Sequence, residues 1–329
     1  MALEHGGRVR AAAQRYGIPE HGWLDLSTGI NPDGWPVPVL PAGIWQPLPQ
    51  DEDGLEEAAR NYYGASQLLA VAGSQSAIQA LPRLRAPCRV ALLATSYAEH
   101  AHAWRGHEVH LLGEAEILQS DADVVVIVNP NNPTGKRYGI AELLALHERL
   151  AARGGWLVVD EAFIDATPEH SLAQFCPREG LIVLRSLGKF FGLAGARVGF
   201  VLAENAVLQA LAELLGPWII AAPSRYVATL ALRDADWQRD ARVALQAAGL
   251  RLSELLGCHG FAPSGYNCLF NWINIDNAAS VHQQLAQQGI LTRLFDAPPS
   301  LRFGLPHGEG ERSEGAWVRL DAALGEIKR

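Results

Sequence analysis

Residues 186–200 read SLGKFFGLAGARVGF and surround one lysine, Lys189, with glycines and apolar side chains. The chain has only two other lysines, Lys136 in a loop rich in Gly, Pro and Asn, and Lys328 near the end of the sequence. A lysine in apolar surroundings has a lowered pKa, and its neutral amine can attack a carbonyl group. A surface lysine on a glycine-rich loop is the alternative interpretation, and the neighbouring motifs decide between the two.

The composition limits the classes of partner that we expect for this chain. Its 329 residues are enough for one large domain or two smaller ones. The net charge is -8 and no block of like charges occurs, which disfavours nucleic acid and membranes as partners. No run of 18 apolar residues and no apolar N-terminal leader is seen, and the four cysteines lack a C-x-x-C spacing. We therefore expect a cytoplasmic protein with free thiols and no metal site.

Short apolar runs that alternate with helical patterns predict an α/β fold with a mainly parallel sheet, covered by helices on both faces. The expected strands are 68–72, 90–94, 124–128, 156–159, 181–184 and 198–202, and the expected helices are 74–84 and 139–153. The later part of the chain predicts helices at 205–215, 224–232, 237–256, 278–288 and 314–327, with strands at 267–275 and 301–304. This change of pattern predicts a large domain over 45–205 and a smaller one over 206–329, to which an N-terminal arm, 1–44, returns.

Polar motifs follow several of the predicted strands, and ligands of open α/β sheets bind beyond the carboxyl ends of the strands. Residues 73–78 read GSQSAI, in which a glycine, hydroxyls and N–H groups form a site suited to a phosphate. A serine that caps a helix after a turn glycine is the structural alternative. Tyr97 follows strand 90–94, where its ring either stacks on a flat heteroaromatic ring or is simply half-buried.

Further polar groups follow the next two strands. Residues 129–136 read NPNNPTGK, in which two prolines stiffen the turn and an Asn offers an amide donor at a fixed point. Asp160 ends strand 156–159, and a carboxylate placed there needs a partner such as a protonated pyridine nitrogen. Arg197, eight residues after Lys189, is suited to a two-pronged contact with a phosphate. Together these groups indicate pyridoxal phosphate, whose aldehyde is a carbonyl that Lys189 can attack.

The motifs NPNNPTG, DEAF, SLGK and RVGF, in this order, resemble the fold-type I pyridoxal-phosphate aminotransferase superfamily over essentially the whole chain. Four further segments, HGG at 5–7, DLSTGINP at 25–32, DEAFID at 160–165 and LRFGLP at 301–306, resemble the threonine-phosphate decarboxylases of cobalamin biosynthesis, relatives of the histidinol-phosphate aminotransferases. The resemblance implies the fold-type I fold, with a mainly parallel seven-stranded sheet in the large domain, a smaller α+β C-terminal domain and a homodimer.

The same resemblance implies how the cofactor is held. Lys189 binds pyridoxal phosphate covalently and transfers protons, while Asp160 pairs with the pyridine nitrogen. Tyr97 stacks on the ring, and Asn132 bonds its phenolic oxygen. Four residues bind the cofactor phosphate, namely Ser74, Gln75, Ser186 and Arg197.

For the substrate, the resemblance implies two separate cationic groups. Arg302 receives the α-carboxylate and Arg293 receives the substrate's own phosphate. His5 and Asn31, on the N-terminal arm, close over the substrate.

Two positions depart from the pattern of many relatives. Phe163 stands where many aminotransferases have a tyrosine, which removes a hydroxyl from the phenolic-oxygen side of the cofactor. Leu48 stands where many relatives have a tyrosine that reaches the cofactor phosphate of the neighbouring subunit.

The resemblance implies a carboxy-lyase that converts L-threonine O-3-phosphate to (R)-1-aminopropan-2-ol O-2-phosphate, which supplies the aminopropanol linker of cobalamin. The bond that breaks at the α-carbon is the one held perpendicular to the cofactor ring, and the residue pattern does not reveal that angle. An aminotransferase that acts on histidinol phosphate or a similar phosphorylated amine is therefore the alternative. A cofactor-sensing regulator of the same fold would need a basic DNA-binding domain, for which this chain has neither spare length nor positive charge.

Overall fold

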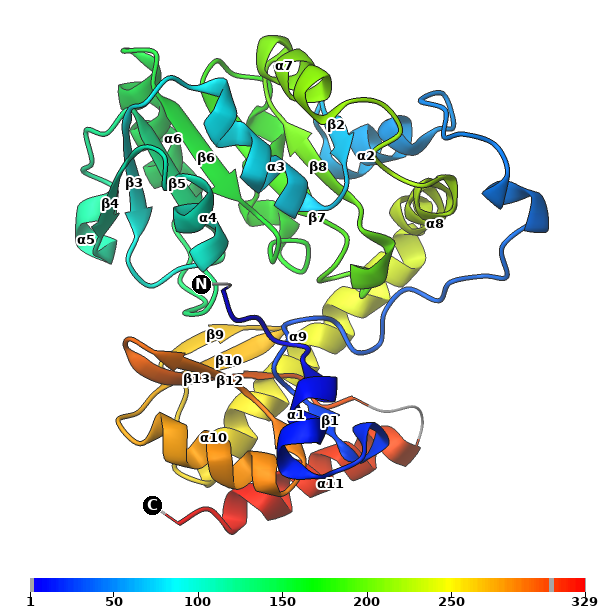
Figure 1. Cartoon of the computed structure of the whole chain (residues 1–329), viewed down its shortest axis with the longest axis vertical. Helices are drawn as coiled ribbons and strands as arrows, with labels where there is room; N and C mark the ends of the chain where they lie inside the picture. Colours follow the sequence, from blue (N-terminus) through cyan, green and yellow to red (C-terminus); the bar gives the residue numbers. More distant parts are fainter. Residues whose placement is uncertain (1–2, 308–310, 329) are drawn as a thin grey trace. The chain divides into compact units, whose positions relative to one another are not determined.

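The structure is a computed structural model that describes residues 3–307 and 311–328 (Figure 1). The chain divides into two compact units. One, the sheet unit, contains residues 34–132 and 137–240, and the other, the small unit, contains the described residues of 1–33, 133–136 and 241–329. Each unit is described by itself.

The sheet unit is built on seven strands in the order β2-β8-β7-β6-β5-β3-β4. Strand β8 is antiparallel to both of its neighbours, β2 and β7, and the pairs among the other strands are parallel. The mainly parallel, seven-stranded sheet that the resemblance implied is thus confirmed. The strands are β2 (Leu69–Val71), β3 (Arg89–Leu93), β4 (Glu108–Leu112), β5 (Val124–Val128), β6 (Trp156–Asp160), β7 (Leu181–Ser186) and β8 (Gly199–Leu202).

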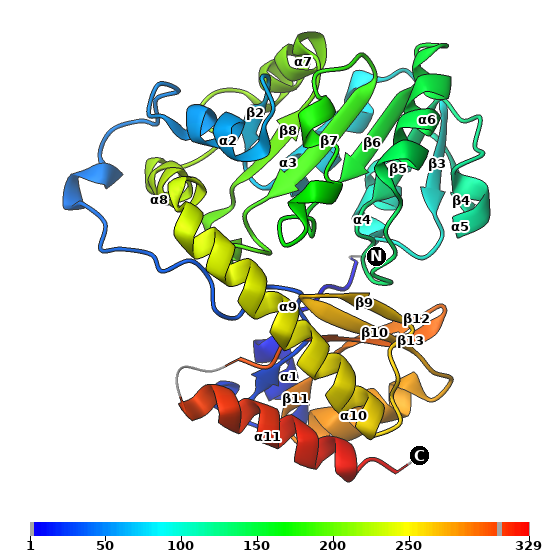
Figure 2. The same ribbon diagram turned by 180° about the vertical axis from the view of Figure 1, so that it is seen from behind.

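Helices cover both faces of this sheet, which is why its central strands are apolar throughout (Figures 1 and 2). Every residue of β5 and β6 is buried. Alternate residues of the strands, such as Val126 and Val158, pack with α3 and α7 in one core. The helices are α2 (Leu55–Tyr63), α3 (Ser74–Ala80), α4 (Ala98–Ala103), α5 (Glu114–Ile117), α6 (Ile140–Ala151), α7 (Asn205–Leu215), α8 (Ala222–Arg233) and the first residues of α9 (Ala235–Cys258).

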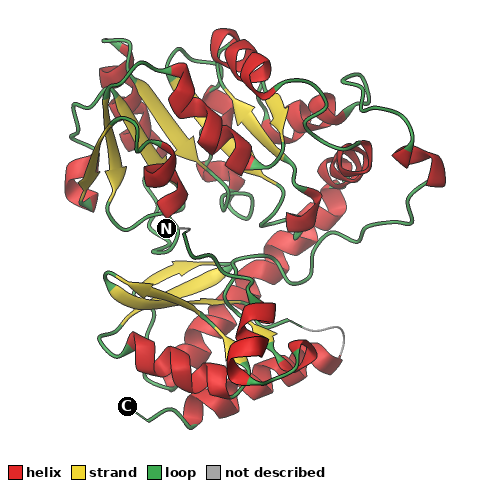
Figure 3. Cartoon of the chain, in the orientation of Figure 1, coloured by secondary structure: helices red, strands yellow, loops and turns green. Residues whose placement is uncertain are grey.

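The small unit has a four-stranded antiparallel sheet in the order β12-β13-β10-β9 and a separate parallel pair, β1 and β11 (Figure 3). Because β1 pairs with β11, the N-terminal segment of the chain is part of this unit. Besides most of α9, its elements are α1 (Val9–Tyr16), β1 (Leu24–Asp25), β9 (Gly265–Asn267), β10 (Phe270–Asn274), α10 (Ala278–Gln287), β11 (Ile290–Leu291), β12 (Arg293–Asp296), β13 (Pro299–Gly304) and α11 (Glu311–Gly325).

Two predicted elements differ from the structure in more than the position of their ends. The single strand expected over 267–275 is two strands, because the side-chain oxygen of Asn267 accepts the N–H of Leu269 (3.0 Å) in a tight turn between β9 and β10. The helix expected over 74–84 is α-helical only to Ala80 and continues as a 3-10 turn that contains Pro82.

The boundaries of the two units differ from the predicted domain limits. Residues 34–44 and 206–240 belong to the sheet unit, since α7 packs on α3 and α8 packs on α2. The domain limits at 44/45 and 205/206 remain a prediction. In the part of the chain that the structure describes, no helix combines the length and the apolar character needed to cross a membrane.

Candidate active site

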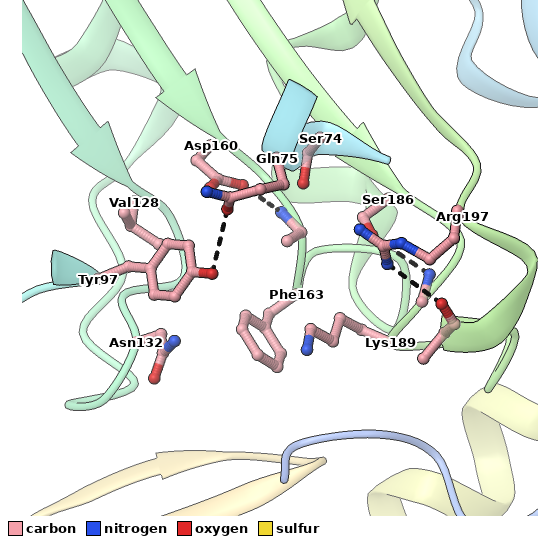
Figure 4. A pocket seen from close by; sticks show the side chains of 13 residues that line it. Ser74, Gln75, Tyr97, Val128, Asn132, Asp160, Phe163, Ser186, Lys189 and Arg197 are labelled. Atoms are coloured by element: carbon pink, nitrogen blue, oxygen red, sulfur yellow. Dashed lines mark hydrogen bonds between the residues drawn. The ribbon is translucent and has the colours of Figure 1, made fainter. Parts of the chain in front are cut away.

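A pocket in the sheet unit lies where β5, β6 and β7 end, and residues that are far apart in the sequence line it together (Figure 4). Tyr97, Asn132 and Asp160 lie on one side of the view, and Ser186, Lys189 and Arg197 lie on the other. All eight residues predicted to bind the cofactor line this pocket: Ser74, Gln75, Tyr97, Asn132, Asp160, Ser186, Lys189 and Arg197.

Lys189 lies in the loop that follows β7, and buried aromatic neighbours fix that loop. Phe190 and Phe191 are fully buried, and both rings pack against Trp237, with centroid distances of 5.4 and 5.6 Å. The Nζ atom of Lys189 lies 5.4 Å from the ring centroid of Phe163, which also lines the pocket. These aromatic contacts hold the backbone of the loop, and the side chain of Lys189 extends into the pocket (Figure 4).

Asp160 is the last residue of β6 and is only 3% exposed. Its Oδ1 atom accepts the N–H of Ala162 (3.0 Å), and its Oδ2 atom lies 3.0 Å from Nε2 of His100. His100 is 2% exposed and lies on α4, three residues and about one helical turn after Tyr97. The sequence pattern did not indicate His100, whose ring packs edge-on against that of Tyr97, the residue before α4, with 6.1 Å between the ring centroids.

Gln75 lies in the predicted pocket, but its side chain bonds other protein groups. Its Nε2 donates to Oε2 of Glu99 (2.8 Å), and its Oε1 accepts from the hydroxyl of Tyr97 (3.2 Å). The amide of Gln75 therefore connects Glu99 to the ring that was predicted to stack on the cofactor. Its contact with the cofactor phosphate stays a prediction.

At the end of the pocket that contains Ser74, Ser186 and Arg197, glycine stands at two positions, 73 and 199. A Cβ atom at Gly73 would lie 2.8 Å from a guanidinium nitrogen of Arg197, and one at Gly199 would lie 2.5 Å from the backbone nitrogen of Ser74. Arg197 has a left-handed backbone (φ 54°) and donates to the carbonyl of Ala194 (3.1 Å). A guanidinium and two serine hydroxyls are donors suited to a phosphate, so the residues present fit pyridoxal phosphate.

In the small unit, three motifs that are far apart in the sequence, HGG, DLSTGINP and LRFGLP, pack against one another. A Cβ atom at Gly6 would lie 2.2 Å from the carbonyl oxygen of Ser27, and one at Gly304 would lie 2.1 Å from that of Thr28. The hydroxyl of Ser27 also accepts the N–H of Gly7 (2.7 Å). Gly6 of HGG and Gly304 of LRFGLP are thus required for close packing against the segment DLSTGINP.

The four predicted substrate residues all belong to the small unit. Arg302 is 6% exposed and donates to the carbonyl of Ser27 (2.9 Å), while Arg293 donates to the carbonyl of Glu4 (2.7 Å). His5 and Arg293 line the same cavity. Asn31 is buried, and its side-chain oxygen accepts the N–H of Asp33 (3.0 Å), so it also stabilises a turn.

Comparisons of sequence find relatives of nearly the same length. A threonine-phosphate decarboxylase from Pseudomonas aeruginosa is 57% identical over 326 residues, which cover 98% of this chain and 97% of that protein. A threonine-phosphate decarboxylase from Sinorhizobium is 42% identical over 320 residues, which cover 94% and 96%.

Comparisons of structure give the same fold. The histidinol-phosphate aminotransferase of Sinorhizobium meliloti, solved in complex with pyridoxal-5'-phosphate, superposes with a TM-score of 0.84 at 20% identity and covers 99% of this chain and 95% of that one. The L-threonine-O-3-phosphate decarboxylase of Porphyromonas gingivalis gives a TM-score of 0.73 at 19% identity, with 90% and 100% covered. These likenesses confirm the predicted fold class.

The family model for class I and II aminotransferases matches residues 47–320, a range that contains all eight pocket residues. The match confirms the prediction of an enzyme with pyridoxal phosphate as cofactor. The pocket at the ends of β5, β6 and β7 and the near full-length relatives agree, and the chain belongs to the class I and II aminotransferase family.

Proposed function

We propose that this protein is a lyase that decarboxylates L-threonine O-3-phosphate to (R)-1-aminopropan-2-ol O-2-phosphate in cobalamin biosynthesis. The observation that carries the proposal is the 57% identity, over nearly the whole chain, to a threonine-phosphate decarboxylase. Two arginines of the small unit support it, because a substrate with a carboxylate and a phosphate needs two cationic groups.

Those two arginines are neighbours in the small sheet. Arg293 on β12 pairs directly with Arg302 on β13 in the antiparallel ladder, so both side chains leave the same face. Each guanidinium lies 5.2 Å from a phenylalanine ring centroid, Phe295 for Arg293 and Phe270 for Arg302. We assign the carboxylate to Arg302, which is the more buried, and the phosphate to Arg293, with His5 and Asn31 as further substrate contacts.

In the sheet unit, the bound cofactor supplies an electron sink for the electron pair of the bond that breaks at the substrate's α-carbon. Asp160, fixed by His100 and by the N–H of Ala162, would pair with the pyridine nitrogen of the bound cofactor. Lys189 provides the amine for the covalent link and a group that can carry a proton. Phe163 lines the pocket without offering a hydroxyl, and Asn132 would donate to the phenolic oxygen of the cofactor.

The test is to incubate the holoenzyme with threonine phosphate and to measure carbon dioxide and pyridoxamine phosphate together. We expect one carbon dioxide for each substrate consumed and no accumulation of pyridoxamine phosphate. Stoichiometric pyridoxamine phosphate without carbon dioxide would instead identify an aminotransferase, for which histidinol phosphate is the next substrate to assay.

We also propose that the protein is a cytoplasmic homodimer without nucleic-acid or membrane partners. The segment before α2 exposes large apolar side chains on the sheet unit, with Val39 98%, Trp45 68% and Leu48 61% exposed. Apolar side chains gathered in this way favour a protein partner, and a second copy of the chain is the simplest one. Sedimentation should give twice the chain mass, and Trp45→Asp should shift the protein toward the monomer, whereas an unchanged sedimentation coefficient for Trp45→Asp would place the interface elsewhere.

A further inference from the structure

The small unit contains a cavity of about 410 Å³ formed by the N-terminal segment, α1, α10 and β12. Its lining includes His5 and Arg293, two of the proposed substrate residues. Two more arginines, Arg8 and Arg15, line it as well, and Glu4 has the only carboxylate among the described residues of the lining. A concentration of positive charge in a chain of net charge -8 favours an anionic ligand.

His282 of α10 also lines this cavity, and its ring is fixed from one side. Its Nδ1 atom lies 2.8 Å from the hydroxyl of Thr292, the residue just before Arg293, and Thr292 is 2% exposed. Among the described residues, no hydrogen-bond partner occupies the other ring nitrogen, Nε2. In His282, Nδ1 therefore bonds Thr292, and Nε2 can bond a ligand.

We infer that His282 binds the substrate's phosphate beside Arg293 and takes up a proton from solvent when the phosphate binds. The inference rests on the proposed function for the identity of the ligand, a phosphate monoester. The Thr292 hydroxyl suits both protonation states, because it donates to Nδ1 when the ring is neutral and accepts from Nδ1–H when the ring is charged.

The charges around His282 explain why its protonation depends on the ligand. Burial lowers the pKa of His282, the nearby Arg15 and Arg293 lower it further, and Glu4 raises it. The other titratable groups of the cavity lining are His5, Arg8 and Tyr16, and α10 itself carries no other charged residue. A dianion among these arginines reverses the local field and raises the pKa of His282, so the protein should bind a dianion more tightly as pH falls.

Sulfate is the appropriate probe, because it is a tetrahedral dianion that does not titrate in the range used. The holoenzyme is titrated with sulfate by calorimetry at about pH 5.5 and about pH 8, on either side of the range in which histidine titrates. Bound pyridoxal phosphate keeps sulfate out of the cofactor-phosphate site. We expect tighter binding at the lower pH, by up to about tenfold, because a bound dianion raises the pKa of His282.

Two substitutions separate the roles of the two ring nitrogens. His282→Gln keeps a donor near the position of Nε2 but cannot be charged, so sulfate should still bind at about pH 8 and the gain on acidification should disappear. His282→Asn keeps a group near Thr292 but has no atom that reaches the cavity, so binding should weaken at both pH values. His110→Gln, a change at an exposed histidine of β4, is the matched control and should bind sulfate like the wild type.

The outcomes distinguish this inference from the proposed function. Sulfate binding with the full pH dependence in His282→Gln would overturn the inference, as would a His282→Asn enzyme with an unchanged KM for threonine phosphate. If His5→Gln alone abolished the pH dependence, His5 and not His282 would take up the proton. A holoenzyme that binds sulfate as expected but releases no carbon dioxide from threonine phosphate would refute the function and leave the anion site standing.

Discussion

Arg293 and Arg302 lie directly opposite each other across the β12–β13 ladder, with both side chains on one face of the small sheet. Like charges in this position destabilise an antiparallel pair by up to about 1 kcal/mol. Glu4, whose Oε2 atom lies 3.8 Å from Nη1 of Arg293, partly neutralises the charge of Arg293. Under the proposed function, a substrate that carries two anionic groups would offset this repulsion.

If Arg293 receives the phosphate, Arg293→Ala should act selectively. Loss of one partner of a buried charged contact costs roughly 2 to 5 kcal/mol. Because the side chain of Arg293 is 20% exposed, we expect a cost at the lower end of this range. This cost corresponds to a decrease of about 30-fold in kcat/KM for threonine phosphate. Weak activity on unphosphorylated threonine should hardly change. Arg10→Ala, at an arginine of the same unit whose side chain is 80% exposed, is the control for general effects. Equal losses on both substrates would remove Arg293 from the phosphate site.

His100 should act through Asp160 as a positioning residue. His100→Leu removes a buried hydrogen bond worth about 1 kcal/mol, so we expect kcat to fall about fivefold with little change in KM. His100→Gln can place an amide near the position of Nε2 and should recover most of the loss. Asp160→Ala removes the charge itself and should lower kcat far more than either change at His100. If KM rose while kcat stayed at the wild-type value in Asp160→Ala, the proposed role of this carboxylate would be wrong.

The covalent link to the cofactor should form at Lys189 and at no other lysine. Borohydride reduction of the holoenzyme, followed by peptide mass analysis, should find the cofactor mass on the peptide that contains Lys189. Lys189→Ala should lose the fixed label and the activity. Label on Lys136 or Lys328 would contradict the assignment, as would a Lys189→Ala protein that turns over normally.

The ion pair between Asp53 and Arg225 should make stability depend on pH. Burial raises the pKa of Asp53, but the hydrogen bonds from Arg225 and from the N–H of Leu55, with the charge of Arg225, outweigh it and lower the pKa. A lowered pKa means that the stabilisation is present at neutral pH and is lost as pH falls through the value in the folded state, below about pH 4. Because Asp53 is partly exposed, solvent screening limits the contribution to about 1 kcal/mol.

Urea unfolding of Asp53→Asn and of the wild type at neutral and acid pH measures this effect. We expect Asp53→Asn to be less stable at about pH 7, with the difference shrinking at about pH 3. Asp51→Asn, at an exposed carboxylate two residues earlier, should behave like the wild type at both pH values. A difference between Asp53→Asn and the wild type that is independent of pH would mean that the charge of Asp53 is not the cause.

The sequence predicted the elements whose patterns are strong and local. The apolar run of β5 and the periodic pattern of α7 have the predicted bounds, since each is buried as its pattern requires. The edge strand β4 was missed because its residues are mostly exposed and lack an apolar run, and α4 was missed because six residues are too few to show a period.

Side-chain partners were harder to predict than pocket membership. Gln75 lies in the expected pocket, yet no pattern indicated that Glu99 and Tyr97 would hold its amide. His100 is a single buried histidine whose partner lies 60 residues away in the chain. The pairing of Arg293 with Arg302 depends on the register of two strands, which the order of residues alone does not give.

The most direct measurement of the central claim is a product analysis by nuclear magnetic resonance in heavy water, starting from threonine phosphate labelled with carbon-13 in its carboxylate. Loss of the carboxylate leaves the α-hydrogen in place and adds one hydron from solvent. We therefore expect labelled bicarbonate in a one-to-one ratio with aminopropanol phosphate that carries one deuterium at the carbon next to nitrogen. If the label stayed in a phosphorylated 2-oxo acid and no bicarbonate signal appeared, the protein would be an aminotransferase and the decarboxylase account would be contradicted.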